Sequence, residues 1–132
     1  MAGIYELVKN RKTYSVTVDQ TVLEAARLMT EHNIGALAVL RDGELAGILS
    51  ERDIVKRVVA LGRSAGLTKV SEVMTAKPRV VSPDETVEEC LFIMREFGFR
   101  HLPILDGNAL KGLVSIRDIF FHPEAQKRAI AS

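Results

Sequence analysis

The sequence predicts a mixed α/β (α+β) fold made of two similar β-α-β-β-α units packed sheet to sheet. The first observation is an internal repeat, since GILSERDI at 47–54 returns as GLVSIRDI at 112–119. A repeat of this kind indicates tandem structural units. The second is that helix-period apolar stripes alternate with short apolar runs typical of strands. The third is the turn residues between paired apolar runs, which predict hairpins.

The repeat extends over most of both halves of the chain. With Thr21 aligned to Thr86, matches include Val16/Val81, Asp19/Asp84, Val22/Val87, Glu24/Glu89, Met29/Met94 and Leu37/Leu102. We divide the chain into 1–66, the first motif with an N-terminal helix, and 67–132, the second motif with a C-terminal tail. A unit of about 60 residues buries little surface alone. We therefore expect the two units to share a core and to form clefts between them.

The first half is expected to begin with a short helix at 4–8 and a brief strand at 16–18. Thr21-x-x-Glu24 has the form of a capping box and starts a helix with one apolar stripe. Residues 33–35 tolerate the left-handed conformation that ends a helix.

A hairpin should follow, with strands 36–40 and 45–49 around the turn 41–44. A second helix is expected from 51 to about 61. Its predicted inner face consists of Ile54, Val55, Val58 and Val59.

The second half repeats this order after a linker at 62–66 and a short helical lead at 70–75. We expect a second capping box at Thr86–Glu89, a helix stop at 97–99, and strands 102–105 and 110–114 around the turn 106–108. The helix after Ser115 should end at His122-Pro123. The tail from Pro123 has the form of a last helix with proline in its first turn.

Composition excludes several classes of function. The 18 basic and 17 acidic residues give no field of one sign, and Trp is absent, so we expect no nucleic-acid partner. No apolar run approaches the length of a membrane span, and the N-terminus does not resemble a signal peptide. The single cysteine, Cys90, lies on an apolar stripe, which favours a core position and a reducing compartment. We therefore expect a cytoplasmic protein without membrane contact.

The repeated motif places a hydroxyl at the end of an apolar run and a carboxylate three residues later. A strand that stops at the serine and turns into a helix would gather the hydroxyl, free backbone N–H groups and the carboxylate around one volume. Such a place suits a polar ligand with oxygen atoms. The alternative is that Ser50 and Ser115 only cap their helices, and that Asp53 and Asp118 only complement the helix dipole. The doubled pattern favours ligand contact.

The same residues resemble the Gly-hydrophobic-x-Ser/Thr-x-x-Asp-hydrophobic signature of the tandem CBS-domain pair, or Bateman module. Arg100–Ile104 looks like the family's segment entering the second strand, and Val70–Thr75 like its Met-Thr linker. The resemblance covers about 8 to 121. It implies binding of an adenosine-containing ligand such as AMP, ADP, ATP or NAD in the clefts, dimerisation, and regulation of other proteins. We expect a non-catalytic energy-sensing homodimer acting on a separate, unidentified protein.

The resemblance also implies roles for individual residues. Asp53 and Asp118 match the carboxylate that accepts hydrogen bonds from the ribose diol, and Ser50 and Ser115 match the hydroxyl directed at ribose or phosphate. The basic side chains placed to meet phosphate are Arg52, Arg117, Arg100 and His101. The groups expected to line the adenine are Val16, Val81, Ala36, Leu37 and Leu102, and Gly35 and Pro103 complete the predicted nucleotide-binding set.

The two repeats differ at one place in this set. The first has GALA at 35–38 where the second has RHLP at 100–103, so the first lacks the basic pair and the proline. We expect inequivalent sites, with the anionic end of a ligand toward Arg100 and His101. Two basic groups, 9–12 and Arg63-Ser64, are expected to be solvated, with a ligand phosphate as the lesser alternative.

Two other classes of function remain open. One is a structural dimerisation or adaptor module whose clefts stay unoccupied. The other is an enzyme, which the sequence disfavours because it shows no Ser-His-Asp spacing, no metal cluster and no P-loop. His32 and His122 have no neighbours in sequence that suggest a metal site. We predict no catalytic residues, no metal ligands and no catalytic cofactor.

Overall fold

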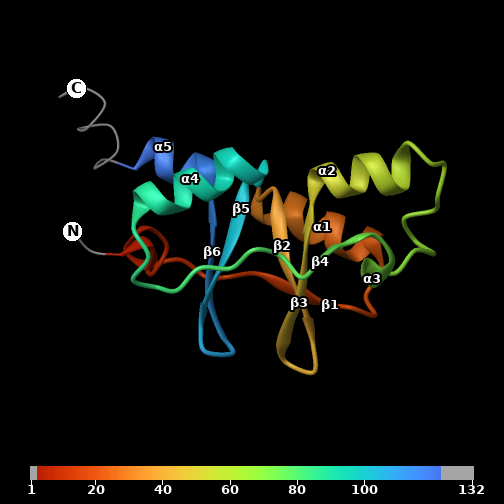
Figure 1. Cartoon of the computed structure of the whole chain (residues 1–132). Helices are drawn as coiled ribbons and strands as arrows, with labels where there is room; N and C mark the ends of the chain where they lie inside the picture. The colour runs from red at the N-terminus through yellow and green to blue at the C-terminus, as the bar shows by residue number, and fades with distance from the viewer. Residues whose placement is uncertain (1–2, 123–132) are drawn as a thin grey trace. The chain divides into compact units, whose positions relative to one another are not determined.

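The computed structural model describes residues 3–122, which belong to two compact units. The first unit is Tyr14–Pro78 and contains the first motif. The second unit combines Met1–Thr13 with Arg79–Ser132 and contains the second motif. Each unit has strands, helices and a hydrophobic core of its own, so the predicted mixed α+β class is confirmed (Figure 1). The predicted tail helix after Pro123 lies outside the described residues.

The first unit is built on a four-stranded sheet in the order β1-β2-β3-β4. Strand β1 is parallel to β2, and the other neighbours are antiparallel. Its elements are β1 (Ser15–Thr17), α1 (Val22–His32), β2 (Ala36–Arg41), β3 (Glu44–Ser50), α2 (Glu51–Ile54), the π-helix η2 (Val55–Val59), α3 (Val70–Val73) and β4 (Thr75–Ala76).

The second unit is built on the antiparallel hairpin β5-β6. Val81 forms a parallel bridge to Ile104 and so occupies the place that Val16 of β1 has beside Val39 in the first unit. Its elements are the 3-10 helix η1 (Ile4–Leu7), α4 (Val87–Phe97), β5 (His101–Asp106), β6 (Ala109–Ser115) and α5 (Ile116–Phe121). Across residues 3–122, each helix is too short or too polar to cross a bilayer.

The helix caps follow the sequence with one exception. Thr21 and Glu24 form the complete predicted capping box. At α4 the Thr86 hydroxyl accepts from the Glu89 N–H at 3.0 Å, but the Thr86 N–H donates to the neighbouring Glu85 carboxylate at 3.1 Å. The predicted second box is therefore only half formed, because Glu85 replaces Glu89 as the acceptor. The predicted helix stops are confirmed, with left-handed Asn33 (φ 52°) and Gly98 (φ 72°).

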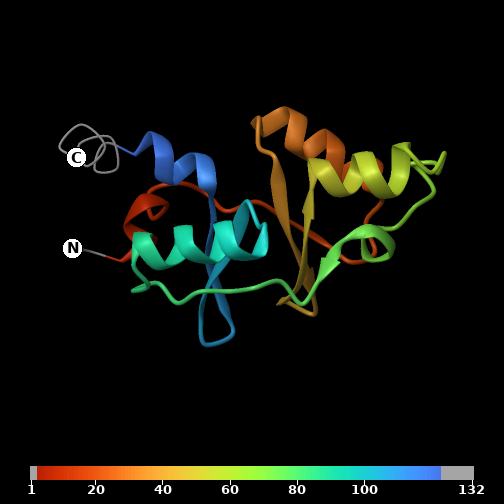
Figure 2. The same cartoon turned by 45° about the horizontal axis from the view of Figure 1, so that its top comes forward.

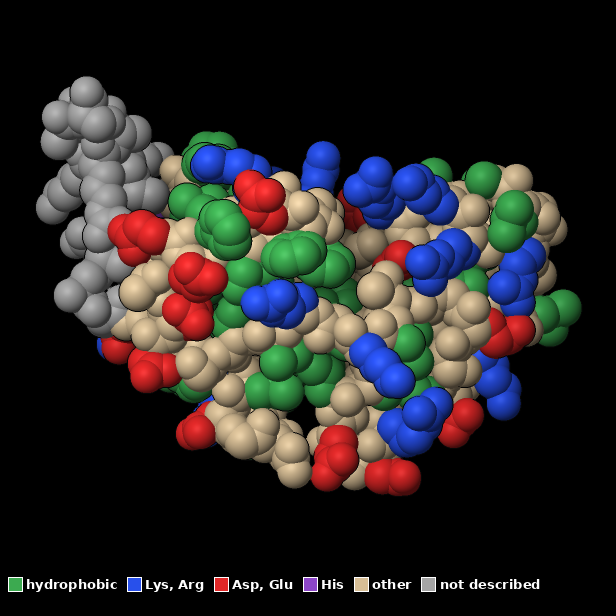
Figure 3. Space-filling model, in the orientation of Figure 1, with side chains coloured by type: hydrophobic (Ala, Val, Ile, Leu, Met, Phe, Trp, Pro, Cys, Tyr) green, Lys and Arg blue, Asp and Glu red, His purple; other side chains and the backbone are tan. Residues whose placement is uncertain are grey.

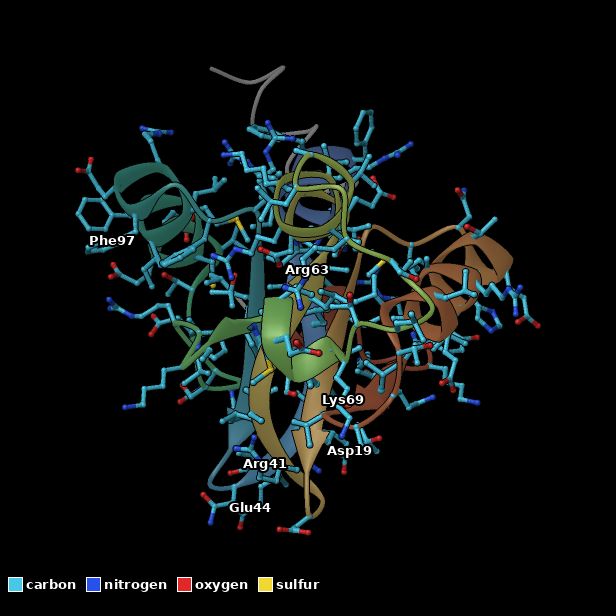
Figure 4. The ribbon with its side chains drawn as sticks, turned by 90° about the vertical axis from the view of Figure 1, so that its right-hand side faces the viewer. Asp19, Arg41, Glu44, Arg63, Lys69 and Phe97 are labelled. Atoms are coloured by element: carbon cyan, nitrogen blue, oxygen red, sulfur yellow. The ribbon has the colours of Figure 1, made fainter. Side chains whose placement is uncertain are left out.

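Both hairpins turn over two residues. Asp42 and Gly43 have φ of 52° and 81°, as a type I′ turn requires, and Gly107 has φ of 61° in the second hairpin. The strands therefore run one residue further than predicted, and Arg41 pairs with Glu44 at the tip of the first hairpin (Figure 4).

The helix after β3 differs from the prediction. After one α-helical turn it continues as the π-helix η2, in which the Ala60 N–H donates to the Val55 carbonyl at 2.9 Å. A π turn closes over five residues, so side chains drift away from the 3.6-residue stripe. Val58 is buried at 1% exposure, but Val55 and Val59 are 58% and 67% exposed. The prediction that Val55 and Val59 face inward is therefore wrong.

Each unit includes the segment that precedes the other unit's motif in sequence. In the second unit the Ile4 N–H donates to the Glu85 carbonyl at 2.7 Å. In the first unit the Val70 N–H donates in the same way to the Gln20 carbonyl at 2.8 Å. Figure 2 shows η1, in red, beside the elements of the second unit. The division at residue 66 describes the sequence repeat, whereas packing groups the N-terminal helix with the second motif.

We call the two stretches that precede one motif in sequence but pack in the other motif's unit the exchanged segments. The glycine of each motif makes room for one of them. A Cβ at Gly47 would lie 2.7 Å from the Thr75 carbonyl oxygen and 2.8 Å from the Met74 sulfur. A Cβ at Gly112 would lie 2.8 Å from a Val8 methyl group. Atoms cannot approach this closely without displacement. The motif therefore begins with glycine in both copies because another segment lies against its backbone.

We expect Gly47→Ala to destabilise the chain by about 1–3 kcal/mol, the usual cost of overpacking. The new methyl group would meet a backbone carbonyl that cannot move without disturbing β4. Urea denaturation of the variant beside Gly66→Ala measures this, because a Cβ at Gly66 meets nothing closer than 3.8 Å. Equal midpoints for the two variants would contradict this account.

Candidate functional site

The serine and aspartate of each motif cap the helix that follows the strand. Ser50 ends β3 and is the N-cap of α2, and its hydroxyl accepts from the Asp53 N–H at 3.1 Å. In return, one Asp53 oxygen, Oδ2, accepts from the Ser50 N–H at 2.9 Å. Ser115 and Asp118 form the same reciprocal pair at 3.0 and 2.7 Å. The capping alternative is therefore realised, and it leaves the other carboxylate oxygen, Oδ1, directed elsewhere.

Asp53 is a buried carboxylate with neutral partners. Its Oδ1 accepts from the Thr75 hydroxyl at 3.2 Å, and its Oδ2 also accepts from the Ser50 hydroxyl at 3.0 Å. Asp53 is 9% exposed, and within residues 3–122 no cation forms an ion pair with it. Because an ionised carboxylate accepts about four hydrogen bonds, Asp53 retains capacity for a further hydroxyl donor.

Asp118 has a charged partner that the sequence analysis did not find. The Arg11 guanidinium donates from Nη1 to Oδ1 and from Nη2 to Oδ2, both at 2.6 Å. Nη2 also donates to the Leu113 carbonyl at 2.8 Å. This is the bidentate fork geometry that makes arginine–carboxylate pairs strong. One signal for this pair is present in the repeat alignment. The alignment sets Arg11 opposite Ala76, which is next to Thr75, the residue that donates to Asp53.

The pair changes the ionisation of both groups. Burial opposes ionisation of Asp118, but the hydrogen bonds from Arg11 and from the Ser115 N–H outweigh it, so the pKa of Asp118 lies below its ordinary value. The hydrogen bond to Asp118 raises the pKa of Arg11. Both shifts indicate that the charged pair is stabilised in the folded chain.

The predicted phosphate-binding residues lie in different settings. His101 stands at the start of β5 directly opposite Ser115, so the structure brings these two together. Arg100 is exposed, and its carbonyl accepts from the Ile116 N–H at 2.8 Å. Arg52 is exposed on α2, and the Arg117 guanidinium lies 5.6 Å from the centre of the Phe121 ring on α5. Phosphate contact remains a prediction for all four basic residues.

The predicted adenine-lining side chains are buried. Those in the first unit are Val16, Ala36 and Leu37, and those in the second are Val81 and Leu102; Pro103, from the wider nucleotide-binding set, is buried as well. Backbone groups beside the motifs connect the strands, since the Gly35 carbonyl accepts from the Glu51 N–H at 3.0 Å. The Pro103 carbonyl accepts from the Val81 N–H, also at 3.0 Å. These side chains belong to the protein interior, and their contact with an adenine remains a prediction.

The remaining candidate groups have structural surroundings. Cys90 is fully buried on α4, which confirms its predicted core position. Burial, with smaller contributions from Glu85 and Glu89, raises the pKa of the Cys90 thiol to about 12. Among residues 3–122, no group of three or more His, Cys, Asp and Glu could hold a metal ion. Arg63 pairs with Glu72 at 2.7 Å.

The sequence matches known proteins along most of its length. A family model described as the CBS domain matches twice, over residues 5–60 and 70–124. The CBS domain-containing protein YhcV of Bacillus subtilis is 42% identical over 105 residues, which are 80% of this chain and 74% of that protein. The mitochondrial CBS domain-containing protein CBSX3 of Arabidopsis thaliana is 39% identical over 108 residues, 78% of this chain and 52% of that protein. The chain therefore spans about half the length of this plant relative.

Solved structures match over nearly the whole chain. A protein with CBS domains from Burkholderia ambifaria is 40% identical with a TM-score of 0.84, and the match covers 98% of this chain and 94% of that one. The CBS domain protein PAE2072 of Pyrobaculum aerophilum, solved in complex with AMP, has a TM-score of 0.84 over 97% and 98% of the two chains. At 23% identity, this second likeness shows the fold alone.

We expect Arg11→Ala to reduce stability in a pH-dependent way. A carboxyl whose pKa is lowered by folding stabilises the folded chain above its ordinary pKa of 3.8, and this stabilisation is lost as pH falls through the lower folded value. The difference in unfolding free energy between wild type and variant should therefore be constant down to about pH 5 and shrink below about pH 4. It should not exceed about 1 kcal/mol, since the Arg11 side chain is 48% exposed.

Urea denaturation at several pH values measures this difference. Arg95→Ala is the control, because it removes an exposed cation of α4 from the same unit. A difference for Arg11→Ala that persists unchanged below pH 4 would show that the ion pair does not stabilise the fold.

Proposed function

Because the chain belongs to the CBS-domain family and carries two such domains, we propose that it is a non-catalytic regulatory module that binds an adenosine-containing ligand. The observation that carries the proposal is the Asp53 carboxylate, buried in the first turn of α2 among neutral donors. Burying a carboxylate without a cation costs free energy unless further hydrogen bonds compensate it. A ribose hydroxyl is such a donor. AMP, ADP, ATP and NAD all carry this sugar.

The second motif has basic side chains that the first motif lacks. His101 lies opposite Ser115 across the β5-β6 pair, and Arg100 is next to it in the chain. The first motif has Gly35 and Ala36 at these positions and so offers no cation there. We propose that the anionic end of a nucleotide lies toward Arg100 and His101. The AMP bound to the Pyrobaculum protein makes AMP a reasonable first ligand to test.

A homodimer is part of the proposal. Phe92 and Phe97 on α4 are 53% and 56% exposed, and hydrophobic side chains are exposed at the surface over this helix (Figure 3). Phe97 points away from the body of the chain (Figure 4). Exposed aromatic side chains of this kind suit association with a second apolar surface. The regulated protein would be a separate chain, and a cytoplasmic location fits the single buried cysteine.

The second candidate is a dimerisation or adaptor module whose motifs stay unoccupied. The observation that favours it is the complete reciprocal capping of both motifs, because capping alone explains the Ser and Asp residues. Ligand binding separates the two candidates. Sedimentation that shows a dimer, together with no binding of any adenine nucleotide at millimolar concentration, would favour the adaptor.

We expect Asp53→Asn to weaken AMP binding about tenfold to a few hundredfold, since hydrogen bonds to a charged group contribute about 1.5–3 kcal/mol each. Asparagine keeps an oxygen that can accept from the Ser50 N–H, so α2 should remain capped. Titration calorimetry measures the affinity, and AMP should also raise the melting temperature of the wild type.

The matched control is Asp19→Asn. It removes one negative charge from the same unit at a side chain that is 80% exposed and 3.8 Å from the Lys69 ammonium group. This variant should bind AMP as the wild type does. Equal affinities for Asp53→Asn and the wild type would refute the assignment of Asp53.

A further inference from the structure

The two motif aspartates differ in the group that donates to their Oδ1 oxygen. Asp53 Oδ1 has one neutral partner, the Thr75 hydroxyl at 3.2 Å. Asp118 Oδ1 has the Arg11 guanidinium at 2.6 Å, and the same guanidinium also holds Oδ2. A bidentate pair between a guanidinium and a carboxylate joins two opposite charges by two hydrogen bonds, so it holds the carboxylate more firmly than one hydrogen bond from a neutral hydroxyl does. A ribose that binds Asp53 displaces little, whereas one that binds Asp118 must first displace Arg11.

The backbone around Arg11 explains why a side chain occupies this place. In the first unit, β4 pairs with β3, and Thr75 stands opposite Ile48. Leu113, the counterpart of Ile48 in the repeat, instead has its carbonyl hydrogen-bonded to the Arg11 guanidinium at 2.8 Å. A strand is held by its backbone, whereas a side chain can rotate away. Because the Arg11 side chain is 48% exposed, it can turn into solvent without unfolding the unit.

We infer that Arg11 makes the two motifs differ in their affinity for ribose, so that an adenosine ligand binds Asp53 first and Asp118 only when the Arg11 side chain has moved away. This inference rests on the proposed function, because it concerns the same ribose contact. Arg11 acts here as an internal competitor of the ribose hydroxyls. A segment outside the repeated motif then adds to the inequivalence that Arg100 and His101 already create between the two motifs.

The test measures ribose binding at Asp118 alone. Asp53→Asn provides the background, since it leaves one motif with its carboxylate, and adenosine is the probe because it has the ribose diol but no phosphate to attract Arg11. We expect Arg11→Ala, added to this background, to tighten adenosine binding about fivefold or more. Arg11→Lys should give a smaller gain, since lysine keeps the charge but cannot form the bidentate pair.

Arg95→Ala on the same background is the control for the lost positive charge, and it should leave the affinity unchanged. Repeating the titrations with AMP tests the opposite role, in which Arg11 binds the ligand phosphate. Melting curves of each variant establish that it is folded before it is titrated.

The outcomes separate this inference from the proposed function. Tighter adenosine binding on removal of Arg11 supports the inference. Unchanged or weaker binding of adenosine, or weaker binding of AMP, on removal of Arg11 overturns it. In that case binding by the wild type at Asp53 still leaves the proposed function intact. If neither the wild type nor any Arg11 variant binds adenosine or AMP, both the inference and the proposed function are refuted.

Discussion

The reciprocal hydrogen bonds between serine and aspartate at the ends of β3 and β6 determine where each motif presents its carboxylate. Each aspartate uses one oxygen to hold the backbone N–H of its serine, and its own N–H is held by the serine hydroxyl. This arrangement fixes the rotamer of the aspartate, because another rotamer would release the helix N-terminus. The direction of the second oxygen is therefore a property of the fold. What differs between the two units is the group that this oxygen meets.

That difference comes from the exchanged segments and not from the motifs. The segment before β1 contributes Arg11 to Asp118, and the segment before the second motif contributes Thr75 to Asp53. Both segments lie so close to their sheets that Gly47 and Gly112 have no room for a Cβ. A duplicated unit can thus keep its motif unchanged while its chemistry is altered from a neighbouring stretch of chain. One carboxylate lies among neutral donors, and the other is neutralised by a guanidinium.

The sequence predicts those features that depend on local pattern. The repeat, the caps at Thr21, Ser50 and Ser115, and the left-handed helix ends all follow from side chains a few residues apart. The sequence does not predict those features that depend on residues distant in the chain or on competing hydrogen-bond partners. The π-helix at Val55–Val59 has the same apolar spacing as an α-helix, so periodicity could not exclude an inward-facing Val55. The pair between Arg11 and Asp118 joins residues 107 positions apart, and no local rule connects them.

Because η1 completes a unit whose other residues begin at Arg79, that unit is built from two separate stretches of the chain, whereas the other unit is contiguous. During synthesis η1 emerges before β5 and β6, the strands of the unit to which it belongs. Its docking must therefore wait until these strands have been made, and it closes a long loop at an entropic cost that grows slowly with loop length. Such late, non-local closure is typical of slow steps in folding. Arg11 can contact Asp118 only through this non-local docking, so one of the two carboxylates depends on a distant segment for its counter-charge.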